Sequence, residues 1–313
     1  MKRVIVTGAN GFVGSNTVAI LIEQGWFVYA VDVVFDNPAV SLWDQNSIEL
    51  ITASCVDLPR LKADALIHGA FITASPEARD ESPEANLRAN IEPMLAMMTY
   101  AREQGIQRSI YLSSSGVYRQ LPDTRISEDH PVNPLGVYAV AKTFMENLVE
   151  TMRTVYQQDV ICIRLGNIYG QYEYQRASRP YLSLIGQMIH MARTTGTIDI
   201  QHPEEAREWT YASDIGRALH VLLQQEHLNY ALYHVASGER LSNLSIAQMI
   251  QTIMTGVNIH KVTGEATTAP LTRLGILDHA RLLADTGFDD WTSFSRDVLA
   301  IIVNDELRSE ADA

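Results

Sequence analysis

The chain has 313 residues, and its 24 basic and 37 acidic side chains give a formal net charge of −13. This length allows one or two domains with a sizeable core, and the acidic balance disfavours nucleic acid or an anionic membrane as a partner. No segment approaches the roughly 18 apolar residues of a membrane span, and the apolar run at the N-terminus stops at Thr7. With Cys55 and Cys162 as the only cysteines and no metal-binding motif among the histidines, we expect a cytoplasmic protein without a metal site.

Short apolar runs alternate with longer helical patterns in the first half of the chain. The runs predict strands at Lys2–Thr7, Phe27–Val31, Ile48–Ala53, Ala65–Gly69, Ser109–Leu112 and Val160–Leu165. The patterns between them predict helices at Phe12–Glu23, Asn86–Glu103 and Tyr138–Tyr156. This alternation indicates an α/β fold with a doubly wound parallel sheet.

The pattern is less regular after Leu165. A helical stretch at Leu182–Arg193 precedes a helix over about 213–223 and a strand at Leu232–Ala236, which add one more α/β unit to the sheet. We therefore expect two domains built from interleaved segments. Residues 1–165 with 206–240 form the nucleotide-binding domain, and residues 166–205 with 241–313 form a smaller, mostly helical substrate domain.

A glycine-rich loop, Thr7-Gly8-Ala9-Asn10-Gly11-Phe12-Val13-Gly14, separates the first strand from the first helix. Glycine permits the tight turn and lets backbone N–H groups approach a pyrophosphate, which the positive end of the helix dipole favours. The loop predicts a dinucleotide site, with an ordinary strand–helix turn as the alternative.

An acidic residue, Asp32, ends the second strand, where a carboxylate can accept hydrogen bonds from the adenosine ribose. The following residues, Val33–Asp36, include no arginine or lysine for a 2′-phosphate, so NAD is favoured over NADP. Asp57, after the third strand, is a candidate for contact with the adenine, with a solvated loop residue as the alternative.

Tyr138 and Lys142 lie one helical turn apart, on the same face of the predicted helix. A phenol with a pKa of about 10 is a poor base at neutral pH, but a neighbouring ammonium lowers that pKa. The pair predicts a catalytic base, with an ordinary surface pair as the alternative. Ser113–Ser115 follow the fifth strand, where a hydroxyl can hold the substrate oxygen whose proton Tyr138 removes; turn chemistry is the alternative.

These motifs, with Arg164–Gly170 and Arg207–Asp214, resemble the extended short-chain dehydrogenase/reductases, in particular the NAD-dependent epimerase/dehydratase family. The resemblance covers about residues 1–290. It implies a Rossmann fold, tightly held NAD and a Ser–Tyr–Lys active site, with Ser114 as the catalytic serine and Ser115 as the alternative.

The resemblance also implies roles for single positions. Together with Tyr138 and Lys142, the cofactor-binding residues that it implies are Gly8, Asn10, Gly11, Phe12, Val13, Gly14, Asp32, Asp57, Leu58, Gly69, Ala70 and Asn90. On the substrate side it implies that Asn167 and Arg207 contact a diphosphate and that Asp278 contacts the nucleotide ribose, with a turn, an ion pair and a helix N-cap as the respective alternatives.

Two departures from the family pattern bear on the substrate. Sugar dehydratases follow the catalytic residue with an Asp-Glu pair, whereas Ser115 and Gly116 stand here, which disfavours a 4,6-dehydratase. The segment Tyr172–Tyr181 adds Arg176 and Arg179, which together with Arg207 predict an anionic substrate, with a solvated loop as the alternative for this segment.

The expected function is an NAD-dependent epimerase that acts by hydride transfer at a hydroxyl carbon of a sugar, with a nucleotide sugar as the leading substrate. The alternatives are a dehydrogenase of a sugar or sugar acid and a catalytically idle NAD-binding regulator. The family typically forms a homodimer through a four-helix interface. Here the apolar residues that predict this interface are Val140, Phe144 and Val155 on one helix, and Met94, Met97 and Met98 on the preceding one, with burial within the same subunit as the alternative.

Overall fold

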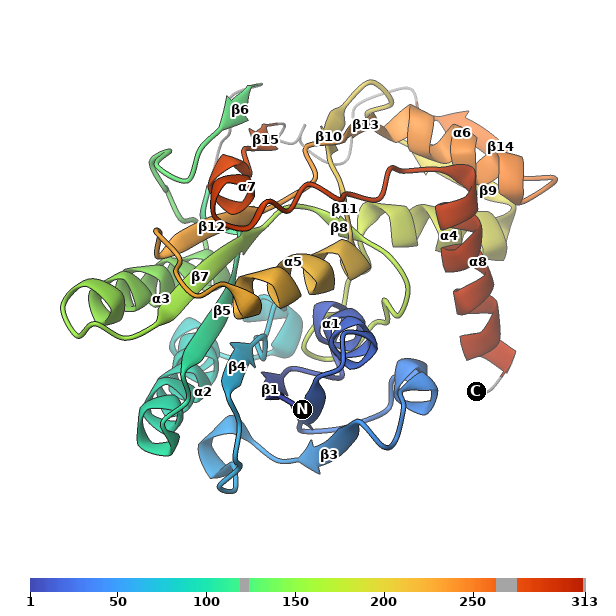
Figure 1. The fold of residues 1–313 in the computed structure, drawn as a ribbon. Coiled ribbons are helices and arrows are strands. Elements are labelled where there is room, and N and C mark those ends of the chain that lie inside the picture. Colours follow the sequence, from blue (N-terminus) through green and yellow to red (C-terminus); the bar gives the residue numbers. More distant parts are fainter. Residues whose placement is uncertain (119–123, 263–274, 312–313) are drawn as a thin grey trace.

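The structure, a computed structural model, describes residues 1–118, 124–262 and 275–311. A central sheet of seven parallel strands has the order β12-β7-β5-β4-β1-β2-β3 (Figure 1). Its strands are β1 (Arg3–Thr7), β2 (Phe27–Asp32), β3 (Ile48–Thr52), β4 (Ala65–His68), β5 (Arg108–Ser114), β7 (Val160–Leu165) and β12 (Leu232–Val235). Every strand predicted from an apolar run is present, and the predicted doubly wound parallel sheet is confirmed.

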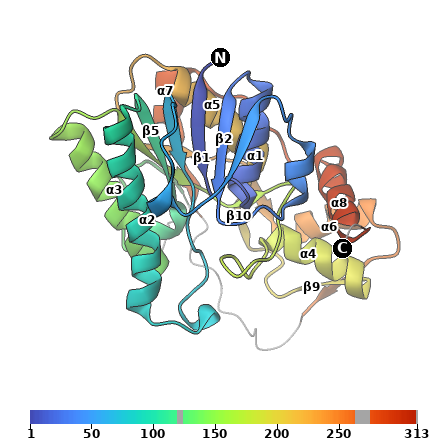
Figure 2. The same cartoon turned by 90° about the horizontal axis from the view of Figure 1, so that it is seen from below.

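Helices cover both faces of this sheet (Figure 2). On one face lie α1 (Phe12–Glu23) and α5 (Ala212–Gln224), and on the other lie α2 (Pro83–Gln104) and α3 (Val137–Thr154). The strands supply apolar side chains to both layers in alternation: Val4 and Val6 of β1 belong to the core beneath α1, whereas Ile5 belongs to the opposite core. Burial on both faces explains why these strands are continuous apolar runs.

The helix α2 begins earlier than the sequence pattern predicts. Ser82 is its N-cap, with a side chain that accepts a hydrogen bond from the backbone N–H of Ala85 at 3.2 Å, and Pro83 occupies the first turn. Gly105 ends the helix in the left-handed conformation, with φ of 67°. The predicted start at Asn86 misses this capping signal.

A second hydrophobic core joins α4 (Leu184–Thr195), α6 (Asn243–Ile253) and α8 (Arg296–Ala311). Its residues come mainly from the two segments assigned to the substrate domain, which supports the predicted division; the division itself stays a prediction. The remaining strands and helices are β6 (Arg125–Ile126), β8 (Ile168–Tyr169), β9 (Thr197–Ile200), β10 (Ala206–Glu208), β11 (Thr210–Tyr211), β13 (Arg240–Ser242), β14 (Asn258–Lys261), β15 (Ile276–Leu277), α7 (Ala280–Thr286), and the 3₁₀ turns η1 (Pro38–Leu42), η2 (Cys55–Asp57), η3 (Glu77–Arg79) and η4 (Ser115–Val117). Within the described residues, no helix has the length and hydrophobicity needed to cross a membrane.

The methionines of α2 require a correction. Met94 and Met97 were expected to need a partner subunit, but both are fully buried within their own chain. Met97 packs with Leu66 of β4, and Met94 packs with Tyr111 of β5, because this face of α2 points toward the sheet. Met98 is half-buried against the same core as Met94.

Candidate active site

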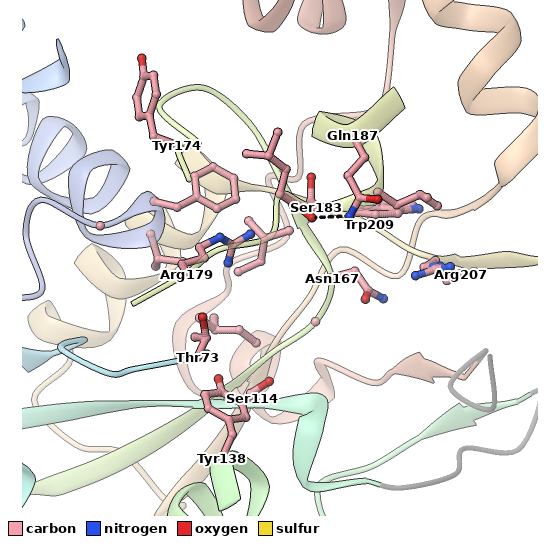
Figure 3. A pocket seen from close by; sticks show the side chains of 18 of the residues that line it. Thr73, Ser114, Tyr138, Asn167, Tyr174, Arg179, Ser183, Gln187, Arg207 and Trp209 are labelled. Atoms are coloured by element: carbon pink, nitrogen blue, oxygen red, sulfur yellow. Dashed lines mark hydrogen bonds between the residues drawn. The ribbon is translucent and has the colours of Figure 1, made fainter. Parts of the chain in front are cut away.

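A pocket of about 900 Å³ lies at the carboxyl ends of the sheet strands. Its wall includes Gly8 after β1, Gly69 after β4, Ser114 at the end of β5 and Gly166 after β7. Residues of α4 form part of the opposite wall, among them Gln187 (Figure 3). Parallel α/β sheets bind ligands at this edge, so the pocket lies where the topology predicts it.

The glycine loop has the geometry that a dinucleotide diphosphate requires. Gly8 has φ of +70°, and a Cβ there would lie 2.7 Å from the backbone N of Ala70. A Cβ on Gly14 would lie 1.9 Å from the carbonyl oxygen of Gly8, so glycine permits the close approach of α1 to β1. The N-cap of α1 is Gly11, which provides no side-chain cap, so an anion in the pocket can approach the first backbone N–H groups of the helix.

Asp32 is fixed beside this loop. Its carboxylate accepts hydrogen bonds from the backbone N–H groups of Asn10 at 3.0 Å and Val33 at 2.8 Å, while burial raises the pKa of Asp32. The sequence offered no arginine after Asp32, but the structure brings Arg176 close from a distant segment and pairs it with Asp36 at 2.7 Å. The predicted preference for NAD over NADP therefore depends on two carboxylates, Asp32 and Asp36, and Asp36 already pairs with the nearby Arg176.

Three other predicted cofactor residues, Asn90, Asp57 and Leu58, do not line the pocket. Asn90 is buried; it accepts a hydrogen bond from the backbone N–H of Ile72 at 2.7 Å and donates to the Ile72 carbonyl at 3.2 Å. Asn90 thus holds the loop after β4, which includes Ala70. Asp57 and Leu58 follow β3 outside the pocket wall, with Asp57 exposed and Leu58 half-buried.

The Tyr–Lys pair lies on the first turns of α3. Lys142 is 3% exposed, its Nζ donates a hydrogen bond to the carbonyl of Leu112 at 2.5 Å, and it lies 3.4 Å from the centroid of the Phe71 ring. The same Nζ is 5.6 Å from the centroid of the Tyr138 ring. Burial lowers the pKa of Lys142 to about 7. The site therefore places a desolvated amine beside the phenol, and both residues line the pocket.

The structure distinguishes the three serines after β5. Ser113 also lines the pocket, but its hydroxyl donates a hydrogen bond to Glu146 of α3 at 2.5 Å and is therefore already engaged within the core. Ser115 lies in η4, outside the pocket wall. Ser114 lines the pocket, as does Tyr138 (Figure 3), and its Oγ accepts a hydrogen bond from the backbone N–H of Gly116 at 3.0 Å. This placement supports Ser114 as the candidate catalytic serine.

A buried ion pair beneath α3 was not predicted. Arg164 of β7 donates to both carboxylate oxygens of Glu146, at 2.9 and 2.7 Å, and both side chains are buried. Arg164 also donates to the hydroxyl of Tyr118 and to the carbonyl of Glu128. The available signal was the position of Glu146, one turn beyond Lys142 on the same face of the helix.

The predicted substrate residues separate into two groups. Asn167 and Arg207 line the pocket; the Asn167 side chain donates to the carbonyl of Glu208 at 3.0 Å, and Arg207 pairs with Glu205 at 3.0 Å. Burial lowers the pKa of Arg207. Asp278 is not part of the pocket wall. Its carboxylate accepts a hydrogen bond from the backbone N–H of Ala280 at 3.1 Å, but the N-cap of α7 is His279, so the N-cap alternative for Asp278 is wrong.

The two arginines of the segment before α4 line the same pocket as Arg207. Their role in substrate binding stays a prediction, and Arg176 pairs with Asp36 after β2. The guanidinium carbon of Arg179 lies 5.2 Å from the ring centroid of Phe12, the first residue of α1. Arg207, in contrast, lies on the far side of the pocket, beyond Asn167 (Figure 3). Arg176 and Arg179 therefore lie on the side of the pocket that the glycine loop forms, and we call this side the cofactor groove.

A doubly wound sheet, a glycine loop at its switch point and a Tyr–Lys pair on the adjoining helix define an NAD-dependent enzyme of the extended short-chain dehydrogenase/reductase type. The chain belongs to the NAD dependent epimerase/dehydratase family, whose model matches residues 4–236. NAD is therefore its cofactor, and the glycine loop and Asp32 fit it. Within the described residues, no group of three or more His, Cys, Asp or Glu side chains is suited to hold a metal ion.

Comparisons with known proteins agree with this assignment. The chain is 26% identical over 223 residues to UDP-glucose 4-epimerase of Mycolicibacterium smegmatis, which covers 68% of this chain and 70% of that one. It is 26% identical over 299 residues to UDP-glucuronate 4-epimerase of Thermodesulfobacterium geofontis, with 87% and 89% covered. In fold it resembles UDP-N-acetylglucosamine 4-epimerase of Methanobrevibacter ruminantium, solved with UDP-N-acetylmuramic acid, with a TM-score of 0.83, 22% identity and 98% of each chain covered.

Proposed function

We propose that the protein epimerises a nucleotide sugar by reversible hydride transfer at a hydroxyl-bearing carbon. The observation that carries this proposal is one pocket that holds the glycine loop and the side chains of Ser114, Tyr138 and Lys142. When bound, NAD supplies a hydride acceptor at this site. The names of the relatives support a nucleotide sugar as the substrate class. The absence of an Asp-Glu pair after Ser114 disfavours water elimination.

Each residue of the set has a separate task in this reaction. Ser114 donates a hydrogen bond to the substrate hydroxyl oxygen and orients it toward Tyr138. The Tyr138 phenolate takes the hydroxyl proton as the hydride leaves the same carbon, and the sugar becomes a ketone. Lys142 favours the phenolate electrostatically. Inversion follows when the ketone turns over, receives the hydride on its other face, and recovers the proton from Tyr138.

Arg207 is the cation that we assign to the substrate's anionic group. Replacing Arg207 with alanine should raise KM for the sugar substrate by roughly 10- to 100-fold, because charge-assisted arginine contacts are strong and directional. NAD affinity should stay unchanged, since Arg207 lies away from the glycine loop (Figure 3). The assay follows product stereochemistry and NADH absorbance over panels of nucleotide sugars, sugar phosphates, sugar acids and free sugars.

The exposed residue Arg102 on α2 provides a matched control, since Arg102→Ala should leave KM unchanged. Turnover of neutral sugars at equal rates by wild type and Arg207→Ala would exclude an arginine-held anion. Net NADH release from a sugar acid, without inversion of any sugar, would instead identify the dehydrogenase.

We also propose a cytoplasmic homodimer. Val140 and Phe144 of α3 are 44% and 42% exposed, and Leu95 of α2 is 40% exposed, so apolar side chains remain on the outward surface of these two helices. Both cysteines are buried and unpaired, which supports a reducing compartment.

Phe144→Glu should convert the dimer to a monomer, because it would place a charge in the core of the interface. Light scattering at micromolar concentration measures the mass. The control is Leu42→Glu, at an exposed apolar residue in η1, outside α2 and α3, which should leave the dimer intact. A monomeric wild type would disprove the proposed assembly.

A further inference from the structure

The segment of residues 171–183, which joins β8 to α4, is tied to several structures that surround the cofactor groove. Its backbone carbonyls accept hydrogen bonds from the side chains of Asn16 in α1, at 2.9 Å, and Asn37 after β2, at 3.4 Å. The carbonyl of Ser178 accepts from the backbone N–H groups of Thr73 and Ala74 after β4, at 2.9 and 3.0 Å. The segment therefore crosses from one side of the groove to the other, and we call it the crossing segment.

Two arginines of the crossing segment are held in fixed relative positions. The backbone groups of Arg176 and Arg179 exchange two hydrogen bonds of 2.9 Å. The Arg176 guanidinium pairs with Asp36 at 2.7 Å, on the side of the groove where Asp32 ends β2. Arg179 lies over Phe12, at the N-terminus of α1.

The lysine and arginine side chains in the pocket wall have distinct positions. Lys142 is buried beside Tyr138, Arg207 pairs with Glu205 on the far side, and Arg176 is engaged by Asp36. Arg179 is the one next to the helix end that favours an anion. We propose that Arg179 binds the diphosphate of NAD, adding a formal positive charge to the backbone N–H groups of α1. This inference concerns the cofactor and is independent of the sugar substrate proposed above.

Buried Glu173 positions the guanidinium for this contact. Its carboxylate accepts hydrogen bonds from Arg179 and from the backbone N–H and hydroxyl of Ser183, both at 2.7 Å. Glu173 is thus fixed to the start of α4, and its carboxylate accepts a hydrogen bond from only one nitrogen of the Arg179 guanidinium, Nη2. Arg179 lines the pocket and its side chain stays 30% exposed, so the guanidinium can still donate hydrogen bonds to a ligand.

The test is calorimetric titration of the cofactor-free protein with NAD and with ADP-ribose, which carries the same diphosphate. Arg179→Ala should raise both Kd values by about 10- to 100-fold, and Arg179→Lys should recover part of the affinity because a point charge replaces the fork. The Kd of Arg179→Ala should also depend less on salt concentration than that of wild type. The matched control is Arg207→Ala, whose Kd for NAD should equal that of wild type.

Equal NAD affinity for wild type and Arg179→Ala, with a raised KM for the sugar, would overturn the inference. It would indicate that Arg179 binds the sugar substrate instead. Circular dichroism checks that each variant is folded. Should the alanine variant not fold, Arg179→Gln in the same titration decides, since it keeps a polar side chain but removes the charge. A wild type that binds NAD with the expected arginine dependence but epimerises no sugar would count only against the proposed function.

Discussion

Tyr138→Phe is expected to lower kcat by about a thousandfold while NAD affinity and the fold are retained. The phenol oxygen is the proposed proton acceptor, and loss of a positioned general base typically costs 10²–10⁴ in rate. The ring itself packs edge-on against Phe71 at 5.6 Å between centroids, and phenylalanine keeps that contact. Steady-state turnover of the nucleotide sugar measures the effect, and calorimetry measures NAD binding.

Tyr156→Phe is the control, because Tyr156 lies just beyond the end of α3 and is 63% exposed. It should have wild-type kcat. If Tyr138→Phe retained most of its turnover, another group would have to accept the proton and the proposed mechanism would be wrong.

Replacing Lys142 should lower the activity of the enzyme and should change its free energy of unfolding in a pH-dependent way. Lowering a phenol pKa from about 10 to about 7 requires roughly 4 kcal/mol of preferential stabilisation of the phenolate, and the neighbouring ammonium contributes to it. Lys142→Met and Lys142→Arg should therefore both lose most of their activity. The arginine variant keeps the charge, but its planar guanidinium does not fit where the compact ammonium of Lys142 contacts the Leu112 carbonyl at 2.5 Å.

Stability should change with pH in a defined direction. Burial lowers the pKa of Lys142 from 10.5 to about 7, so the folded state binds this proton more weakly than the unfolded chain does. The resulting destabilisation is fully present below pH 7 and disappears as the pH rises toward 10.5. Lys142→Met lacks this charge, so its free energy of unfolding relative to that of wild type should be highest near pH 7 and decline toward alkaline pH.

Urea unfolding of the cofactor-free proteins between pH 7 and pH 9.5 measures this difference. Lys62→Met serves as the control, because Lys62 is an exposed lysine whose removal should give no such pH dependence. A difference between wild type and Lys142→Met that did not vary with pH would show that Lys142 is not destabilised by burial.

The sheet was predictable from the sequence because each strand is covered on both faces. Runs such as Val160–Leu165 are apolar at almost every position, and the intervening helices follow a clear helical period. The short strands after Leu165 were not predictable in the same way. The strand β8 has two residues and pairs with β11, about 40 positions later, so no local periodicity marks it.

The candidate catalytic set was predictable because its chemistry fixes local spacing, as with Tyr138 and Lys142 on one helix. The ion pairs of the arginines were not, because ion pairing depends on which distant segments meet in the fold. Arg176 and Asp36 are separated by 140 positions, and only the crossing segment brings them together. The local sequence shows that Arg179 carries a charge, but it does not show that this side chain lies over the N-terminus of α1.

The buried Glu146–Arg164 ion pair limits the substitutions that can be accepted at these two positions during evolution. Either partner alone would become an uncompensated buried charge, at a cost of about 3–5 kcal/mol, whereas joint replacement by apolar residues of similar volume is often neutral. Replacement of Glu146 or Arg164 alone should therefore be selected against, whereas replacement of both residues together should be tolerated. Since Glu146 also holds Ser113, next to the candidate catalytic serine, the joint step would free that hydroxyl within the core. We expect the two positions to covary, and lineages that lost both to have changed residue 113 as well.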